Sequence, residues 1–161
     1  MPNFLFWNIG RKAICPLVAE VARCAEADFV VLCECTAAPH EVVDSLNQRA
    51  ADYRYAFGEC KSLMFFTKFE PSYLVPKFET PHISIRHLSL PARTDVLVVG
   101  AHLPSGLYNS RESLAHECQF LARYIDQEEQ TVGHRRTILL GDLNVNPFES
   151  GVVGAGVFTR C

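Results

Sequence analysis

The chain has 161 residues, of which 48% are hydrophobic and 20% charged, and its formal net charge at pH 7 is −3. This length is enough for one domain with a buried core, and it is too short for two, so we expect a single domain over residues 1–161. The acidic balance argues against a surface that is basic all over and holds nucleic acid by charge alone. It leaves room for a local basic patch, for example at Arg11 and Lys12.

Hydrophobic patterning predicts alternating strands and helices. In chain order we expect a strand at 3–9, a helix at 13–27, a strand at 29–34, a helix at 39–51, strands at 53–57, 63–67, 73–78, 83–90 and 95–102, a helix at 109–130 and a strand at 137–141. The run FVVLCE is typical of a strand buried on both faces. This order favours sheets covered by helices, an α/β or α+β layered domain.

Neither the cysteines nor the hydrophobic runs indicate a secreted or membrane protein. Seven irregularly spaced cysteines disfavour a disulfide framework. Cys33 and Cys35 would share one face of a strand and Glu34 the other, a poor geometry for a joint metal site, so we expect inert, buried thiols. No apolar run reaches the roughly 20 residues of a membrane span. Residues 1–11 lack the basic start and cleavage site of a signal peptide, so a cytoplasmic location is expected.

Polar residues gather where four of the expected strands end. Asn8 ends the first strand and Glu34 the second, His102 ends the strand at 95–102, and Asp142 and Asn144 follow the last. Ligand-binding groups of layered α/β proteins usually lie at such strand ends. Each residue alone also has a structural explanation, such as an Asx-turn. In extended backbone, Asp142 and Asn144 would point the same way because side chains alternate.

Together these residues form a set of carboxylates, carboxamides and an imidazole, with no thiolate required. Oxygen-rich sites suit Mg²⁺ or Mn²⁺, and Mg²⁺ commonly takes only one or two carboxylates, leaving room for waters and a phosphate. Amides donate hydrogen bonds to phosphate oxygens, and an imidazole contacts or protonates them. The set therefore indicates metal-assisted hydrolysis of a phosphate ester.

In this order, the motifs resemble those of the endonuclease/exonuclease/phosphatase superfamily, the deoxyribonuclease I-like proteins. FLFWNIG is similar to the family's first strand with its Asn, and DFVVLCE to its Asp-x-Val-x-Leu-Gln-Glu strand, with Cys33 in place of the usual Gln. VVGAHLPS is similar to the strand that ends in His or Tyr, and RESLAHECQFLARYI to the helix that follows. ILLGDLNVNP is similar to the Gly-Asp-Phe-Asn signature, with Leu143 in place of Phe. The resemblance covers residues 3 to about 150.

This resemblance implies a four-layer α/β/β/α sandwich and a Mg²⁺ or Mn²⁺ cofactor. It implies that Glu34 is the principal metal ligand, with Asn8 beside it. His102 would bind the scissile phosphate, and Asp142 would orient or deprotonate the attacking water. Asn144 would hold a phosphate oxygen or assist the metal.

The sequence departs from the family pattern at its end. The family continues into a Ser/Thr-Asp-His motif, but residues 148–161 contain neither Asp nor His. We expect either a fragment of a longer enzyme that lacks the C-terminal strands, or a short variant whose site is incomplete or completed by another chain. We therefore expect this chain alone to have weak or no phosphodiesterase activity, because losing a central catalytic group typically costs several powers of ten in rate. An unpaired sheet edge would also favour self-association or a partner chain.

Three functions stay open at this point. The first is a metal-dependent endo- or exonuclease that hydrolyses nucleic-acid phosphodiesters. The second is a phosphatase or phosphodiesterase acting on a small phosphoester, such as an inositol phosphate, a lipid head group or a nucleotide, which the acidic net charge fits slightly better. The third is a non-catalytic interaction module that keeps the fold.

Overall fold

The computed structural model describes residues 2–105 and 111–145 of the chain. Within them the order of strands and helices matches the predicted order. The elements are β1 (Phe4–Asn8), α1 (Cys15–Cys24), β2 (Phe29–Cys33), α2 (Pro39–Asn47), β3 (Arg54–Ala56), β4 (Leu63–Thr67), the 3-10 turn η1 (Pro71–Tyr73), β5 (Leu74–Glu79), β6 (Ile83–Leu88), β7 (Val96–His102), α3 (Arg111–Val132) and β8 (Thr137–Asp142).

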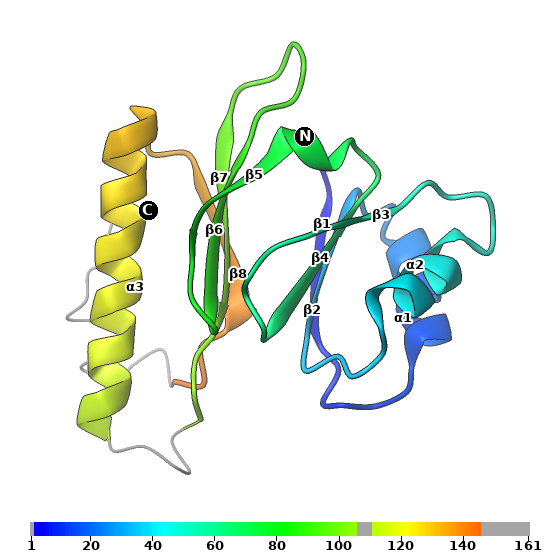
Figure 1. Cartoon of the computed structure of the whole chain (residues 1–161), viewed down its shortest axis with the longest axis horizontal. Coiled ribbons are helices and arrows are strands. Elements are labelled where there is room, and N and C mark those ends of the chain that lie inside the picture. The colour runs from blue at the N-terminus through cyan, green and yellow to red at the C-terminus, as the bar shows by residue number, and fades with distance from the viewer. Residues whose placement is uncertain (1, 106–110, 146–161) are drawn as a thin grey trace.

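Two four-stranded sheets form the centre of the molecule. The first has the strand order β1-β2-β4-β3, and the second has the order β5-β6-β7-β8. The sheets face each other; α1 and α2 cover the outer face of the first, and α3 covers the outer face of the second (Figure 1). Because each sheet buries one face against the other sheet and one against helices, the predicted α/β/β/α arrangement is confirmed for the described residues.

Each sheet contains one parallel strand pair next to antiparallel neighbours. β2 runs parallel to β1 and antiparallel to β4, and all five of its residues are buried. In the second sheet, β8 runs parallel to β7. A parallel pair needs a crossover connection, which α1 supplies in the first sheet and α3 in the second. Each pair therefore brings two strand ends to the same edge of its sheet.

Apolar side chains fill the spaces between the four layers. Alternate residues of β2, such as Phe29 and Val31, pack between the two sheets with Phe65 of β4. The intervening residues Val30 and Leu32 pack on the opposite face, under α1 and α2. A third cluster lies under α3. The period of two along β2 thus places its apolar residues in two separate cores, as a doubly covered strand requires.

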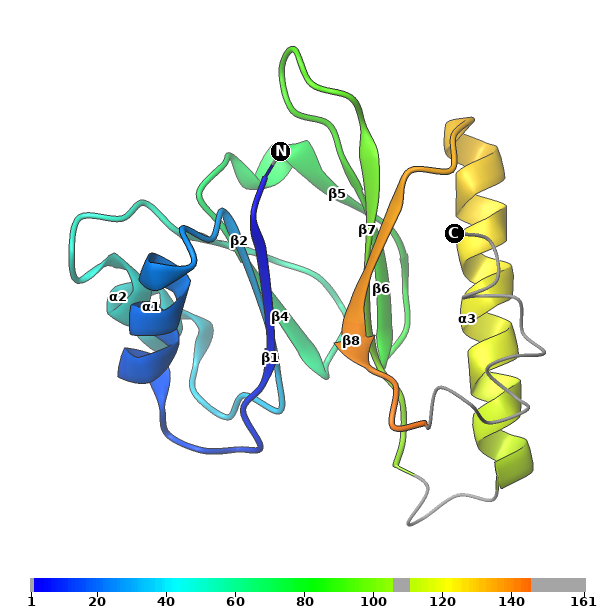
Figure 2. The same ribbon diagram turned by 180° about the vertical axis from the view of Figure 1, so that it is seen from behind.

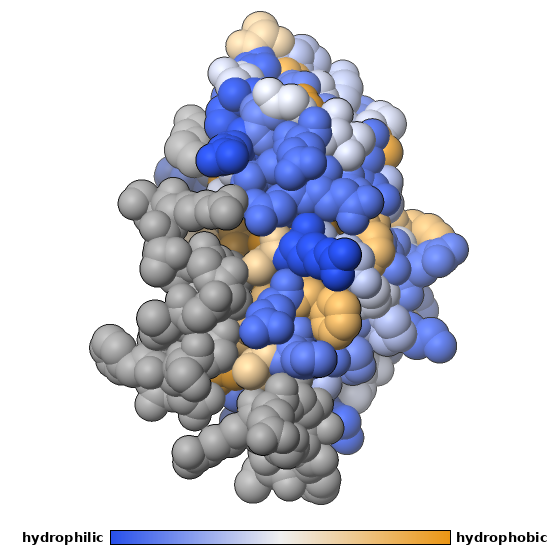
Figure 3. Space-filling model, turned by 90° about the vertical axis from the view of Figure 1, so that its left-hand side faces the viewer, coloured by the Kyte–Doolittle hydropathy of each residue, from blue (hydrophilic) through white to orange (hydrophobic). Residues whose placement is uncertain are grey.

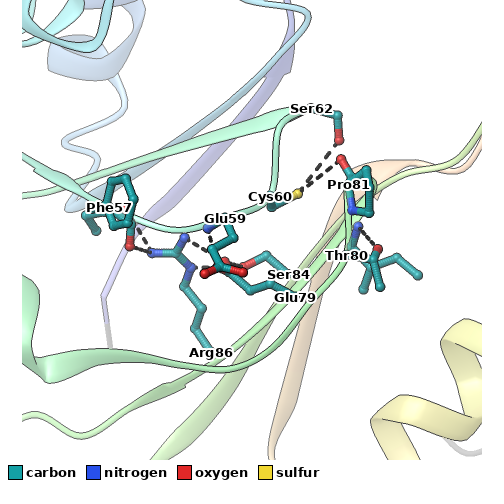
Figure 4. Close-up of polar contacts among 11 residues, drawn as sticks. Phe57, Glu59, Cys60, Ser62, Glu79, Thr80, Pro81, Ser84 and Arg86 are labelled. Carbon is teal, nitrogen blue, oxygen red and sulfur yellow. Dashed lines mark hydrogen bonds and ion pairs between the residues drawn. The ribbon is translucent and has the colours of Figure 1, made fainter.

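A buried ion pair within the second sheet also hydrogen-bonds to the end of β3 in the first sheet (Figure 4). Arg86 of β6 is only 1% exposed, and its Nη2 lies 2.9 Å from Glu79 Oε1. Its Nη1 donates hydrogen bonds to the backbone carbonyls of Ala56 (2.9 Å) and Phe57 (3.3 Å). Its Nε donates to Ser84 Oγ at 2.9 Å. These partners offset the cost of removing the guanidinium from water.

Several boundaries differ from the sequence-based prediction. α1 is shorter than predicted, and Pro16 lies in its first turn, where a missing N–H breaks no helical hydrogen bond. α2 ends at Asn47, before the predicted residue 51. α3 extends to Val132, and Gly133 follows it with φ +74°, the left-handed geometry that commonly ends helices. The predicted start of α3 at residue 109 lies outside the described residues.

The outer face of α3 is mainly hydrophilic (Figure 3). Leu121 on its inner side is buried against the second sheet, as expected for an amphipathic helix. Phe120 is an exception on the outside, at 42% exposed. Among the described residues, no helix has the length and apolar character needed to cross a membrane.

Candidate active site at the strand ends

The two parallel strand pairs bring four of the predicted site residues to one edge of the sandwich. In the first sheet Asn8 is paired with Cys33, so that Glu34 comes directly after the end of β2. In the second sheet His102 is paired with Asp142. β1 and β8 both end at the lower side of the molecule in Figures 1 and 2. The four polar side chains therefore meet where both sheets end.

Asn8 connects the two sheets through its side-chain amide. Its Nδ2 donates hydrogen bonds to Glu34 Oε1 (3.2 Å) and to Asp142 Oδ2 (2.9 Å). Its Oδ1 accepts a hydrogen bond from the backbone N–H of Gly10 at 2.9 Å. Because that N–H requires an acceptor, the amide is oriented with its donor group toward both carboxylates.

Glu34 is held at the end of β2 in an unusual backbone conformation. Its φ is +51°, in the left-handed region that costs a non-glycine residue free energy. The backbone N–H of Arg11 donates to the Glu34 carbonyl at 2.9 Å, which fixes this turn. The Glu34 side chain is 31% exposed, and its Oε2 has Arg11 Nε at 4.0 Å. The carboxylate thus has Oε1 bound to Asn8, and Oε2 on the side of the Arg11 guanidinium.

His102 contacts the same carboxylate from the second sheet. Its Nε2 lies 3.5 Å from Glu34 Oε1, and its side chain is 19% exposed. Its backbone N–H donates to the carbonyl of His82, which ties the end of β7 to the start of β6. Its Nδ1 is buried without a hydrogen-bond partner among the described residues. The imidazole therefore has one ring nitrogen that no described protein group satisfies.

Asn144 does not join this group, because β8 ends at Asp142. The expectation of extended backbone through Asn144 is wrong: its φ is +51°. Its backbone N–H donates to Asp142 Oδ1 at 3.1 Å, closing an Asx-turn, and its Nδ2 donates to the Leu103 carbonyl at 2.8 Å. The local hydrogen bond of the aspartate competes with the strand and prevails here. Leu143 packs against the core under α3, as predicted.

The cysteines beside Glu34 behave as inert thiols. Cys33 is fully buried, and burial raises the pKa of its thiol to about 12, with a further contribution from the carboxylates of Glu34 and Asp142. Burial also raises the pKa of Cys35. A protonated thiol is a poor nucleophile and metal ligand. No disulfide links cysteines within residues 2–105 and 111–145.

Comparison with known families identifies the fold and the motif set together. The model of the endonuclease/exonuclease/phosphatase family matches residues 3–156. The chain belongs to the endonuclease/exonuclease/phosphatase family. The matched region includes all five predicted site residues. A comparison with curated protein sequences finds no match.

Several solved structures share the fold of this family member at low sequence identity. Humanized D. rerio TDP2 is 15% identical with a TM-score of 0.59, over 96% of this chain and 66% of that chain. Mannosyl-6-phosphatase Bt3783 of Bacteroides thetaiotaomicron is 13% identical with a TM-score of 0.62, over 98% and 70%. A mutant beta toxin of Staphylococcus aureus with bound magnesium ions is 12% identical with a TM-score of 0.64, over 96% and 68%. The chain spans 48% to 66% of the length of four TDP2 structures.

The donor groups at this edge fit a hard divalent cation. Glu34 and Asp142 supply carboxylate oxygens, and the Glu34 side chain is 31% exposed. Mg²⁺ binds proteins through one or two carboxylates and keeps several waters. In the described part of the chain, no group of three or more His, Cys, Asp or Glu side chains is arranged to hold a metal ion by itself. The arrangement therefore suits a cation that is shared with waters and a substrate.

Arg11 is a neighbour of the site that the sequence interpretation assigned to a basic turn. Its side chain is 78% exposed and approaches Glu34, while its backbone holds the Glu34 turn. Its position three residues after Asn8 is the signal that could have revealed it, because the Asn8–Gly10 turn folds the chain back toward the site. Residues 146–161, which include the segment without Asp or His, lie outside the described residues.

A cavity of about 640 Å³ lies away from these residues. It is lined by α1, α2 and residues such as Asn3 and Asp28, which precede β1 and β2. It therefore lies at the start of β1 and β2, whereas Glu34 lies at the other end of these strands.

Proposed function

We propose that the chain supplies the metal-binding and phosphate-binding part of a divalent-metal-dependent phosphoric ester hydrolase. The observation that carries this proposal is the joint at Asn8, whose amide bridges Glu34 of the first sheet and Asp142 of the second. His102 contacts the same Glu34 carboxylate. Membership of the endonuclease/exonuclease/phosphatase family and a structural neighbour with bound magnesium ions support it.

In this proposal Glu34 holds Mg²⁺ or Mn²⁺ through its carboxylate. Asn8 keeps the carboxylate in place and separates it from Asp142. When bound, such a cation stabilises the negative charge that develops on phosphoryl oxygens. The partial exposure of Glu34 leaves room for the waters and the phosphate that complete the coordination of such an ion.

The second sheet supplies the groups that act on the substrate. His102 would donate a hydrogen bond to a phosphate oxygen, using the imidazole that lies beside Glu34. Asp142 would orient the attacking water and accept its proton, because a carboxylate within hydrogen-bond reach acts as a general base. Asn144 positions Asp142 through its backbone N–H. Its side chain would reach a phosphate oxygen only by leaving the Leu103 carbonyl.

Within this class we propose a nucleic-acid phosphodiester as the substrate. Arg11 places a positive charge beside Glu34, and Lys12 follows it in the sequence, so that basic side chains are available for a phosphate backbone. A small phosphoester is the second candidate, favoured by the net charge of −3 and by a neighbour described as a mannosyl-6-phosphatase. A module that binds partners without catalysis is the third.

A substrate panel with matched variants tests the proposal. Single-stranded and duplex DNA, RNA and a set of small phosphoesters would be incubated with the chain and either Mg²⁺ or Mn²⁺. We expect weak cleavage, which chelation of the metal ion abolishes. Glu34→Gln and Asp142→Asn should each reduce the cleavage rate at least 100-fold. Glu26→Gln, at an exposed residue outside the site, is the matched control. Cleavage that survives both site variants would refute the assignment.

Metal binding provides a second readout that does not depend on turnover. A cation that binds only the folded chain raises its melting temperature. We expect Mg²⁺ or Mn²⁺ to raise the melting temperature of the natural chain and of Glu26→Gln, and to have little effect on Glu34→Gln. If the metal ions do not shift the melting temperature and no substrate is cleaved, the result would favour the non-catalytic module.

A further inference from the structure

The turn after β1 holds Arg11 in a strained backbone conformation. Gly10 and Arg11 have φ angles of +57° and +60°, and the backbone N–H of Lys12 donates across them to the Ile9 carbonyl at 3.1 Å. A tight turn with two successive left-handed residues normally has glycine, asparagine or aspartate at both central positions. Gly10 meets this requirement. An arginine at the second position lowers the stability of the fold, because its Cβ atom disfavours positive φ.

Glu34 is strained in the same way, and its backbone is bonded to that of Arg11. Its φ is +51°, and its carbonyl accepts a hydrogen bond from the Arg11 N–H at 2.9 Å. The strained turn therefore continues the pairing of β1 with β2 beyond their last paired residues. Six non-glycine residues in the described part of the chain have positive φ, and three of them belong to the candidate site: Arg11, Glu34 and Asn144. The others follow helix ends or lie in the β6–β7 loop: Glu26, Ala50 and Ala92.

The contacts of the Arg11 side chain do not explain this strain. The side chain is 78% exposed, and its Nε lies 4.0 Å from Glu34 Oε2, which is longer than a hydrogen bond. An ion pair as exposed as this one adds little to the stability of a fold. Both the backbone and the side chain of Arg11 therefore point to a role other than stability, and strained residues of this kind are concentrated at functional sites.

The Glu34 carboxylate is approached from two sides by positively charged or proton-carrying groups. His102 of the second sheet has its Nε2 at 3.5 Å from Oε1, and Arg11 of the first sheet is beside Oε2. A ligand at Glu34 is therefore within reach of an imidazole on one side and of a guanidinium on the other. The guanidinium is the more exposed of the two and is held only loosely.

We propose that Arg11 is a specificity residue, which leaves Glu34 for a substrate phosphate when the site is loaded. This inference rests on the proposed hydrolase function. In the free chain the guanidinium neutralises part of the Glu34 charge. When Glu34 carries a divalent cation, the guanidinium is repelled by a charge of its own sign and turns to the substrate. Its planar set of N–H donors can bind a phosphate through two parallel hydrogen bonds.

The phosphate bound by Arg11 is a second one, next to the scissile phosphate. His102 is assigned to the scissile phosphate, and it approaches Glu34 from the other sheet. A nucleic-acid strand carries a neighbouring phosphate at every nucleotide, whereas a substrate with a single phosphodiester has none. Arg11 therefore favours a polynucleotide over a substrate with one phosphate. Its contribution is to binding, and the groups that act on the scissile bond stay those proposed above.

The first test follows metal binding through the melting temperature, without any turnover. Removing the guanidinium from Glu34 should let Mg²⁺ or Mn²⁺ bind more tightly. We expect Arg11→Gln to reach a given rise in melting temperature at a metal concentration roughly threefold lower than the natural chain needs. Arg135→Gln removes the same charge ahead of β8, at the other end of this strand from the site, and should bind metal like the natural chain.

The second test measures substrate binding in an Asp142→Asn background, which slows cleavage in all variants. A labelled single-stranded oligonucleotide is titrated with protein and Mn²⁺ by fluorescence anisotropy, and a dinucleoside monophosphate, which has one phosphodiester, is used as competitor. We expect Arg11→Gln to weaken oligonucleotide binding roughly fivefold and to lower its salt slope by about 0.7, as expected for one lost phosphate contact. Binding of the dinucleoside monophosphate should not change. Arg135→Gln should change neither affinity.

Arg11→Gly separates the role in binding from a role in stability. Glycine adopts a φ of +60° without strain, so this variant should melt at least as high as the natural chain. It should nevertheless bind the oligonucleotide as poorly as Arg11→Gln. Ala92→Gly removes a residue with φ +56° from the β6–β7 loop and is the control for the change to glycine. This variant should bind the oligonucleotide like the natural chain.

The outcomes distinguish this inference from the proposed function. If Glu34→Gln responds to metal like the natural chain, both fail. If Glu34→Gln abolishes the metal response but Arg11→Gln and Arg135→Gln bind metal and oligonucleotide equally, the role of Arg11 is overturned and the proposed function stands. A clear fall in the melting temperature of Arg11→Gly would also overturn it, because Arg11 would then be a structural residue. So would an equal loss of oligonucleotide and dinucleoside monophosphate binding in Arg11→Gln.

Discussion

The amide nitrogen of Asn8 lies 2.9 Å from Asp142 Oδ2 and 3.2 Å from Glu34 Oε1. One residue of the first sheet thereby holds a carboxylate of its own sheet and a carboxylate of the other. Two carboxylates that share a small site repel each other, and a shared hydrogen-bond donor reduces that repulsion. The same hydrogen bonds of Asn8 therefore arrange the candidate site and connect the two sheets. Metal binding and fold stability should consequently be coupled.

Replacing this donor by a third carboxylate should destabilise the fold. We expect Asn8→Asp to lower the free energy of unfolding by about 1–3 kcal/mol at pH 7, because two hydrogen bonds are lost and a like charge is added. Mg²⁺ should restore more stability to this variant than to the natural chain, since a cation offsets the added charge. Urea unfolding with and without Mg²⁺ measures both effects. Gln127→Glu, which adds the same charge on the exposed side of α3, is the control, and an equal loss there would contradict the interpretation.

Gly141 sets the distance between β7 and β8 one residue before the site. A Cβ atom at this position would lie 2.3 Å from the backbone oxygen of Ala101. Gly141→Ala should therefore cost about 1–3 kcal/mol through a backbone shift, and it should separate His102 from Glu34. Ile138→Val on the same strand removes one methylene without such a clash and should cost about 0.5–1.5 kcal/mol. If activity or metal binding falls equally in both variants, the loss in Gly141→Ala is not caused by a change in the spacing of β7 and β8.

The elements and the common strand-end position of Asn8, Glu34, His102 and Asp142 could be predicted from the sequence because both signals are local. A continuous apolar run such as Phe29–Cys33 indicates a doubly buried strand by itself, and polar residues at strand ends mark a common edge. The extended backbone predicted through Asn144 was wrong, because the strand period says nothing about the competing hydrogen bond that the Asn144 backbone N–H donates to Asp142 Oδ1.

The buried ion pair of Arg86 was not predictable from local pattern. Arg86 lies within the strand sequence ISIRHL, where an alternating polar residue would ordinarily face water. Its partner Glu79 is across a hairpin, and its carbonyl acceptors are Ala56, the last residue of β3 in the other sheet, and the following Phe57. Only the tertiary arrangement supplies these partners. The same is true of Arg11, whose relation to Glu34 depends on the turn after Asn8.

Removing one member of the Arg86–Glu79 pair should be much more harmful than removing both. Arg86→Ala leaves a buried carboxylate without its partner and should cost about 3–5 kcal/mol. The double variant Arg86→Met with Glu79→Leu should recover part of that loss, because no isolated charge stays buried. Arg54→Ala, at the more exposed ion pair with Asp52, should cost no more than about 1 kcal/mol. Chemical denaturation of the natural chain and the three variants gives the comparison, and a double variant less stable than Arg86→Ala would contradict this interpretation.

Cys33 should resist alkylation in the folded chain. It is fully buried with a thiol pKa raised to about 12, whereas Cys24 is exposed. Since the thiolate is the reactive form, iodoacetamide at pH 8 should modify Cys24 and leave Cys33 intact until the chain unfolds. Peptide mapping after brief labelling measures this. Modification of Cys33 at the same rate as Cys24 would contradict its burial.

The same pKa shift predicts how stability depends on pH. In the unfolded chain the thiol titrates near 9.0, and in the folded chain near 12, so between these values only the unfolded state releases the proton. Stability from Cys33 is therefore fully present below pH 9 and declines as the pH rises toward 12. Tyr53, whose pKa burial also raises to about 12, contributes to the same decline. Cys33→Ala should consequently show a shallower loss of stability between pH 9 and 11 than the natural chain, measured by urea unfolding. Cys24→Ala should follow the natural profile, and identical slopes for both variants would show that Cys33 titrates normally.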